Sequence, residues 1–269
     1  MSMKTSVVIA DGTFPTATAP LLGSVASVFA QAAELGYDAV SVTVNHPDDV
    51  EVEAILAAMD QYGVKVSGLA TGRICGADGF SISSANEANR TEAVNRMLGH
   101  LEICKKLDAK LIIGTVRGRV AVAGDHETYE KQFRKSMTVI LEKAEQLGVK
   151  VMLEAMSELD GDTYQTVAEA GECVRSFHSP ALQLQIDTMH IAYNKEDFVS
   201  DIRTYGDLLG QVDISDPERM VPGGKLFDFP ALIEVLKEVG FEGYLLSEFR
   251  AAPPENAAKV GLDYIKSLL

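Results

Sequence analysis

Four acidic side chains stand at the ends of four successive hydrophobic runs in the second half of the chain. Glu154 ends the run VMLE, Asp187 ends LQLQID, Asp213 lies in QVDI, and Glu248 follows YLLS. If these runs are parallel strands of a barrel, the four carboxylates meet at one mouth. Carboxylates that lie close together repel one another unless a cation binds between them. The pattern therefore predicts a divalent metal site, and its oxygen ligands favour Mn²⁺ or Mg²⁺, with Co²⁺ or Zn²⁺ as alternatives.

Cationic and neutral polar residues follow several of the same runs. His190 lies three residues after Asp187, Arg117 follows the fourth hydrophobic run, and Arg219 follows the seventh. Arginine presents a rigid fork of donors to hydroxyl, carboxylate or phosphate oxygens, so these residues are candidates for binding a substrate. Simpler interpretations remain open. An acid at a strand end can cap the next helix, His190 can be a buried structural histidine, and Arg117 can pair with surplus acids.

The chain carries no motif for nucleophilic catalysis or for phosphate binding. Ser215 and Ser247 lie near the ends of hydrophobic runs, but no G-x-S-x-G motif surrounds either serine. The segment MVPGGK does not have the glycine spacing of a P-loop. Acyl transfer and nucleotide hydrolysis are therefore excluded.

Eight short apolar runs alternate with eight longer amphipathic runs and must position these residues. The predicted strands span residues 4–10, 38–44, 65–71, 109–115, 150–155, 182–187, 210–215 and 243–248. The predicted helices span residues 23–36, 48–62, 86–107, 125–147, 163–178, 195–209, 228–239 and 254–268. Nearly continuous apolar strands are typical of parallel sheets, and eight βα units of roughly 30 residues match a closed barrel. We expect an α/β protein with one (β/α)8 TIM-barrel domain over residues 1–269. A doubly wound open sheet is the alternative, but no glycine fingerprint follows the first strand.

Composition and charge exclude several classes of protein. The chain has 269 residues, of which 46% are hydrophobic and 23% charged, as in ordinary globular proteins. A net charge of −15 without any basic run argues against nucleic acid as a partner. The apolar runs are shorter than the ~20 residues that a membrane span requires. Three separated cysteines predict reduced thiols, so we expect a cytoplasmic protein that does not bind a membrane.

Several segments, taken in order, resemble one family of barrels. They are ATGRICGADGFSISSANEANRTEAVNRMLGH, KLIIGTVRGR, LEAM, IDTMH, DISDPERMVPGGKLFDF and GYLLSEF. They resemble the third to eighth strands, with adjoining segments, of the sugar isomerase/epimerase branch of xylose-isomerase-like TIM barrels. The closer resemblance is to the D-tagatose 3-epimerase and 5-keto-L-gluconate epimerase group, and it covers nearly the whole chain.

The resemblance implies a role for individual residues. Glu154, Asp187 and Glu248 match the family's metal ligands, and the two glutamates match its acid and base. His190 and Arg219 match residues that contact the substrate. A cation would stabilise an enediolate, while one glutamate removes a proton next to a carbonyl group and the other returns one.

Three positions depart from the family's pattern. Asp213 stands where the family has a histidine ligand, Ala155 replaces a proline, and Asp160 aligns with a glutamate six residues after the strand-5 ligand. Asp213 either completes a shell of four carboxylates or turns away and leaves three ligands. We assign Asp160 and Arg117, with His190 and Arg219, to substrate binding.

The resemblance implies a divalent-metal-dependent sugar epimerase or isomerase of the ketose 3-epimerase type. Its substrate would be a small sugar, a keto-sugar acid or a sugar phosphate, and the protein could form a homo-oligomer. A lyase similar to inosose dehydratase and a degenerate, non-catalytic sugar-binding barrel are the alternatives. A DNA-repair endonuclease on this fold would need several histidine ligands and a cationic groove, neither of which the sequence indicates.

Overall fold

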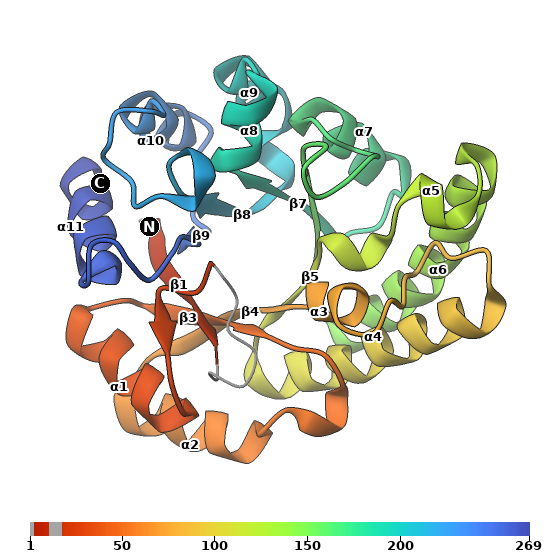
Figure 1. Cartoon of the computed structure of the whole chain (residues 1–269), viewed down its shortest axis with the longest axis horizontal. Coiled ribbons are helices and arrows are strands. Elements are labelled where there is room, and N and C mark those ends of the chain that lie inside the picture. Colours follow the sequence, from red (N-terminus) through yellow and green to blue (C-terminus); the bar gives the residue numbers. More distant parts are fainter. Residues whose placement is uncertain (1–2, 11–17) are drawn as a thin grey trace.

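Eight parallel strands pair in sequence order and close into a barrel (Figure 1). The computed structural model describes residues 3–10 and 18–269. The barrel strands are β1 (Lys4–Ala10), β3 (Ala39–Thr43), β4 (Lys65–Ala70), β5 (Lys110–Ile113), β6 (Val151–Glu154), β7 (Leu182–Asp187), β8 (Leu209–Ile214) and β9 (Tyr244–Ser247). The short strand β2 (Leu21–Leu22) pairs with the end of β1, and pairing of β9 with β1 closes the barrel. The predicted (β/α)8 barrel is confirmed, and the open sheet is excluded.

The longer helices cover the outside of the strands (Figure 1). They are α1 (Val25–Leu35), α2 (Val52–Tyr62), α4 (Glu87–Leu107), α6 (His126–Leu147), α7 (Val167–Ser176), α9 (Phe198–Tyr205), α10 (Phe229–Glu238) and α11 (Ala257–Leu268). The described chain contains no helix with both the length and the apolar composition needed to cross a membrane.

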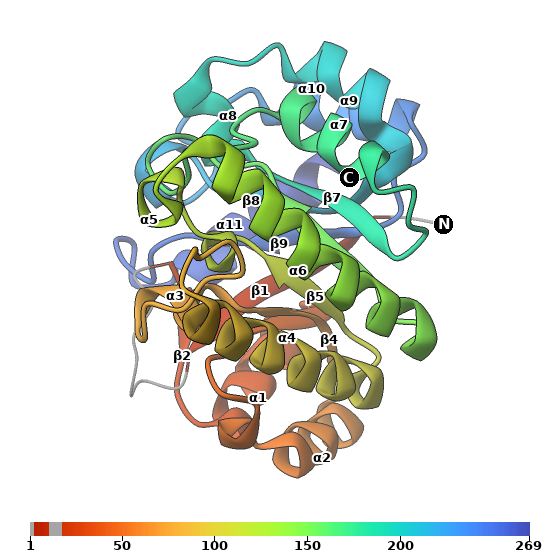
Figure 2. The ribbon, with the colours of Figure 1, turned by 90° about the vertical axis from the view of Figure 1, so that its right-hand side faces the viewer.

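Shorter helices lie in the loops. They are α3 (Gly72–Gly76), α5 (Val120–Ala123) and α8 (Thr188–Asn194), together with 3₁₀ turns at Pro47–Asp49, Thr115–Arg117, Gly206–Leu208 and Pro217–Arg219. Figure 2 shows α3, α5 and α8 at one end of the barrel, opposite the N-terminus. Because β1 begins near that terminus, these helices lie at the end where the parallel strands finish.

Local signals set most helix boundaries. Gly36 and Gly148 end α1 and α6 with φ of 89° and 69°, a left-handed conformation that favours glycine. The side chains of Asn86 and Asp125 accept backbone hydrogen bonds at the starts of α4 and α6. Helix α8 differs from the expectation, which placed helix only from residue 195. It starts directly after β7 because the Asp187 carboxylate accepts a hydrogen bond from the Met189 N–H at 2.7 Å.

Side chains alternate in direction along each strand. One set packs in a hydrophobic core beneath the helices, and the other set points into a polar barrel interior. In β8, Val212 belongs to the hydrophobic core, while Gln211 and Asp213 face the other way and hydrogen-bond to each other. Ser6 and Ser67 also join across the barrel interior through their hydroxyl oxygens, 2.7 Å apart. The strand period therefore turns polar side chains inward below the mouth and directs Asp213 into it.

Candidate active site at the carboxyl ends of the strands

A cavity of about 590 Å³ opens at the mouth of the barrel. The predicted site residues on its wall are Glu154, Asp160, His190, Asp213, Arg219 and Glu248. Asp187 is fully buried, and its carboxylate reaches the same group of residues. The structure therefore brings together side chains from the ends of β6, β7, β8 and β9 and from the loops that follow them.

The four carboxylates form one cluster. One oxygen atom from each of Glu154, Asp187, Asp213 and Glu248 lies within 4.8 Å of the corresponding oxygens of the others. Asp213 therefore faces the cluster, which is the first of the two orientations considered above. Two of these acids also form a second group, in which ligand atoms of Glu154, Asp187 and His190 lie within 4.8 Å of one another.

The cluster is electrostatically costly in the absence of a cation. Burial raises the pKa of Glu154 well above its usual range, and the charges of Glu248 and Asp187 raise it further. Burial likewise raises the pKa of Asp213, and then the charges of Glu248 and Glu154 do so. Burial also raises the pKa of Glu248, although the Arg219 guanidinium opposes that shift. Buried oxygens that resist ionisation beside one another fit a divalent cation, whose charge would remove the repulsion.

Arg219 lies against the cluster as an internal cation. Its Nη1 donates to Oδ2 of Asp187 and, at 3.3 Å, to Oε2 of Glu248. The neighbouring carboxylates raise the pKa of Arg219 despite its burial, so the side chain stays charged.

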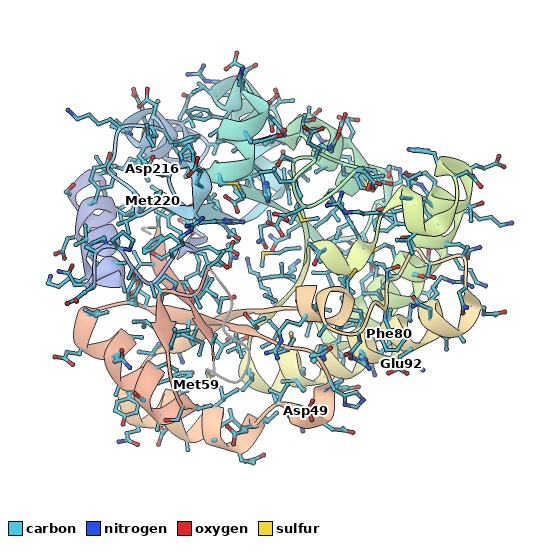
Figure 3. The ribbon with its side chains drawn as sticks, in the orientation of Figure 1. Asp49, Met59, Phe80, Glu92, Asp216 and Met220 are labelled. Carbon is cyan, nitrogen blue, oxygen red and sulfur yellow. The ribbon has the colours of Figure 1, made fainter. Side chains whose placement is uncertain are left out.

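The loop that carries Arg219 is closed at its base. Asp216 and Met220, labelled in Figure 3, exchange two backbone hydrogen bonds, with N–O distances of 2.9 and 3.2 Å. The Asp216 carboxylate also accepts a hydrogen bond from the Gly224 N–H at 2.7 Å. These contacts hold the 3₁₀ turn Pro217–Arg219 at the mouth of the barrel.

His190 connects the cluster to the loop after β6. Its Nδ1 lies 2.9 Å from the Ser157 hydroxyl, and its Nε2 lies 3.6 Å from Oδ2 of Asp160 and 3.9 Å from Oε1 of Glu154. Burial lowers the pKa of His190, while the charge of Asp187 opposes this. The ring is therefore predominantly neutral near pH 7 and can exchange hydrogen bonds with a polar ligand.

Arg117 is not brought to the cavity, in contrast to its assignment to substrate binding. The side chain is fully buried, and its two terminal nitrogens donate to the backbone carbonyls of Glu154 and Thr163. The physical reason is local. The 3₁₀ turn Thr115–Arg117 directs the guanidinium toward the backbone at the end of β6.

Four polar residues at the site were not singled out from the sequence. Gln185 and Gln211 donate to the two oxygens of Asp213, Thr18 donates to Glu248, and Ser157 contacts His190. The two glutamines stand two residues before Asp187 and Asp213, so the strand period places them on the same face as these acids. That spacing is a signal from which they could have been found. Thr18 and Ser157 lie in loops and give no such signal.

A second cavity of about 340 Å³ lies beside the first. Its wall combines apolar residues such as Ile9 and Val42 with polar ones such as His46, Glu51 and Arg73. It contains none of the predicted site residues.

A comparison with known proteins identifies the family of this chain. The chain belongs to the xylose isomerase-like TIM barrel family, whose model matches residues 29–268. The resemblance drawn from the ordered segments is confirmed.

Individual relatives are similar over most of their length. The 3-dehydro-D-guloside 4-epimerase of Escherichia coli is 24% identical over 248 residues, which cover 87% of this chain and 91% of the relative. The D-psicose 3-epimerase of Agrobacterium fabrum is 23% identical over 80% of this chain and 76% of its own length.

Solved structures share the fold. A 3-keto-D-glucoside 4-epimerase from Escherichia coli superposes with a TM-score of 0.81 at 20% identity, covering 99% of this chain and 100% of that structure. A D-psicose 3-epimerase with D-tagatose from Clostridium cellulolyticum gives 0.82 at 17% identity and covers 99% of both chains. At these identities the likeness supports the barrel architecture alone.

Proposed function

We propose that the protein is a divalent-metal-dependent sugar epimerase of the ketose 3-epimerase type. The observation that carries the proposal is the cluster of four carboxylates at the barrel mouth, with Arg219 and His190 beside it. Membership of the family and the similarity to named sugar epimerases support the substrate class.

Glu154 and Glu248 are the proposed acid–base pair. Glu154 ends β6 and Glu248 follows β9, three strands further round the barrel, so the two side chains approach the cavity from different sides. One carboxylate removes the proton from the carbon next to the substrate's carbonyl group, and the other, already protonated, delivers a proton to the opposite face. The carbon is thereby inverted. A carboxylate is a suitable base for this step, and its protonated form is a suitable acid.

The four clustered carboxylates would hold the cation, and their oxygen atoms favour Mn²⁺ or Mg²⁺. When bound, the ion would polarise the carbonyl oxygen and stabilise the negative charge that develops during proton abstraction. Asp213 would be the fourth ligand in place of the family's histidine.

Arg219, His190 and Asp160 are the proposed substrate-binding residues. The Nε2 atom of His190 lies 3.6 Å from the Asp160 carboxylate, and both side chains line the cavity. A sugar hydroxyl placed between them could donate to Asp160 and accept from the imidazole. Arg219 would donate to a second substrate oxygen from the opposite loop, so the sugar is held at two points.

A metal-free sugar-binding barrel is the second candidate, and one observation favours it. Arg219 already neutralises part of the cluster, and two glutamine amides satisfy the carboxylate of Asp213. These contacts give the acids partners without a bound ion.

Metal analysis followed by a panel of ketoses distinguishes the two candidates. We expect the purified protein to bind one Mn²⁺ per chain and to exchange the C3 proton of at least one ketose with solvent deuterium. A protein that binds neither Mn²⁺ nor Mg²⁺ and exchanges no substrate proton would overturn the epimerase assignment and support the metal-free barrel.

A further inference from the structure

Arg117 forms a buried bridge behind the catalytic wall. Its Nη1 donates to the backbone carbonyl of Glu154 and its Nη2 to that of Thr163, each at 2.5 Å. The two carbonyls lie at the two ends of the segment that leaves β6 and carries Ser157 and Asp160. One guanidinium therefore holds both ends of this segment.

The surroundings of Arg117 satisfy its two terminal nitrogens, whereas its Nε is buried without a hydrogen-bond partner in the described part of the chain. Its side chain is fully buried, and within the described residues it forms no ion pair with a carboxylate. The Tyr164 ring lies 5.9 Å from its Cζ, and a Cβ atom on Gly161 would lie 2.6 Å from its Nη2. A buried charge is costly, so this arrangement must be stabilised by the two carbonyl bonds. Burial lowers the pKa of Arg117, and the nearby Glu154 carboxyl group opposes this shift.

Residues held by the Arg117 bridge also have side chains that face the cavity. Glu154 supplies the backbone carbonyl that Arg117 holds and a side chain in the carboxylate cluster. Ser157 and Asp160, within the bridged segment, contact the two ring nitrogens of His190. A shift of this segment would therefore move a proposed proton-transfer group and the proposed substrate-binding pair together.

We propose that Arg117 is a positioning residue, whose guanidinium ties the end of β6 to Thr163 and so fixes Glu154 and the loop with Asp160 against the cavity. The catalytic part of this inference rests on the proposed epimerase function, whereas the bridge itself does not. Direct substrate contact is excluded because the side chain is fully buried and is absent from the cavity wall.

The test compares R117M and R117K with R119M. Arg119 is a matched control because its Nη2 also donates to a carbonyl of the same loop, that of Leu159, at 3.0 Å, without contacting Glu154. Each protein is assayed for kcat and KM on the active ketose, and amide hydrogen exchange is followed over residues 155–163.

We expect R117M to lower kcat by about 30-fold or more, because a reacting group is misplaced, and to raise KM by a smaller factor, because Ser157 and Asp160 move with the same segment. Exchange over residues 155–163 should be about tenfold faster. R117K can bond to one carbonyl and should recover part of both losses. R119M should stay within about twofold of the wild type in both measurements. If R117M does not fold, R117K and G161A, which crowds the guanidinium, replace it.

Three results would overturn the proposal. They are a folded R117M with unchanged kcat, a loss confined to KM, and an equal loss in R119M. If the wild type converts no sugar, the proposed epimerase function is wrong, and amide hydrogen exchange alone tests the bridge. Faster exchange in R117M but not in R119M supports the bridge, and unchanged exchange in R117M refutes it.

Discussion

The side-chain amide of Gln185 on β7 donates to the carboxylate of Asp213 on β8, with an Nε2–Oδ2 distance of 2.7 Å. Gln211 donates to the other oxygen at 3.0 Å. Each amide oxygen is buried and has no partner within the described part of the chain. Asp213 is therefore held in the cluster by its own strand and by the neighbouring one.

We predict that D213H changes the metal preference. Four carboxylates favour a hard cation, whereas an imidazole ligand shifts the ratio of Mn²⁺ to Co²⁺ affinity toward Co²⁺ by about tenfold. Titration calorimetry with both ions measures the ratio, and D207H, at an exposed aspartate, is the control. An unchanged ratio in D213H would show that residue 213 does not ligate the ion. If only D213H binds metal and converts a ketose, the native protein is a metal-free barrel.

Removing the basicity of either glutamate should stop proton transfer. E154Q and E248Q keep the shape of the side chain but cannot accept the proton, so kcat should fall by ~10²-fold or more. Incorporation of solvent deuterium into the substrate is the measurement, and thermal unfolding checks that both variants are folded. Wild-type exchange rates in either variant would contradict its assignment.

Replacing Arg219 should weaken substrate binding. R219A removes a donor to substrate and also the internal cation beside Asp187 and Glu248, so KM should rise by about tenfold or more. R203A is the control, because Arg203 pairs with Glu238 on the surface. A constant KM for every active substrate would exclude Arg219 from binding.

Gly114 leaves the space that the Glu154 carboxylate occupies. A Cβ atom on Gly114 would lie 2.6 Å from Oε2 of Glu154, so G114A should displace this oxygen from the cluster. We expect a folded variant, because the displaced atom ends a flexible side chain, and a loss of about 10²-fold in kcat. G76A, where a Cβ atom meets nothing within 4 Å, is the control. Equal activity in G114A and G76A would mean that this space is not needed.

His100 should make the protein sensitive to acid. Burial lowers the pKa of His100 to about 4, while its Nε2 stays 3.0 Å from the carbonyl of Asn45. Between pH 6.5 and pH 4 the unfolded chain therefore binds more protons at this site than the native state, so stability falls as the pH falls. Between pH 6.5 and pH 4 this histidine lowers the free energy of unfolding by about 3 kcal/mol, and the loss is complete below pH 4.

H100Q removes this titration while keeping a side-chain amide donor. Urea unfolding at pH 7 and pH 4.5 should show a smaller loss of stability in H100Q than in the wild type. H178Q serves as the control for replacement of a histidine. An identical pH dependence in the wild type and H100Q would contradict the expectation.

Much of the barrel could be predicted from local sequence. The predicted strands 4–10 and 182–187 coincide with β1 and β7, and the helices α1 and α6 end at the glycines Gly36 and Gly148. Hydrophobic runs and left-handed helix ends depend on neighbouring residues, which is why sequence alone indicates them. The meeting of Glu154, Asp187, Asp213 and Glu248 follows from the same pattern, since parallel strands must finish at the same mouth.

The partners of individual polar side chains were decided by the tertiary structure. Arg117 and Arg219 both follow barrel strands and look alike in sequence, yet Arg219 faces the carboxylates and Arg117 lies buried against two carbonyls. Which environment each guanidinium enters depends on groups that are remote along the chain, such as Thr163 for Arg117 and Asp187 for Arg219. A local pattern specifies the residue types and the strand period. Only the closed barrel sets the distances, and these decide which guanidinium faces the cavity and which one lies buried away from it.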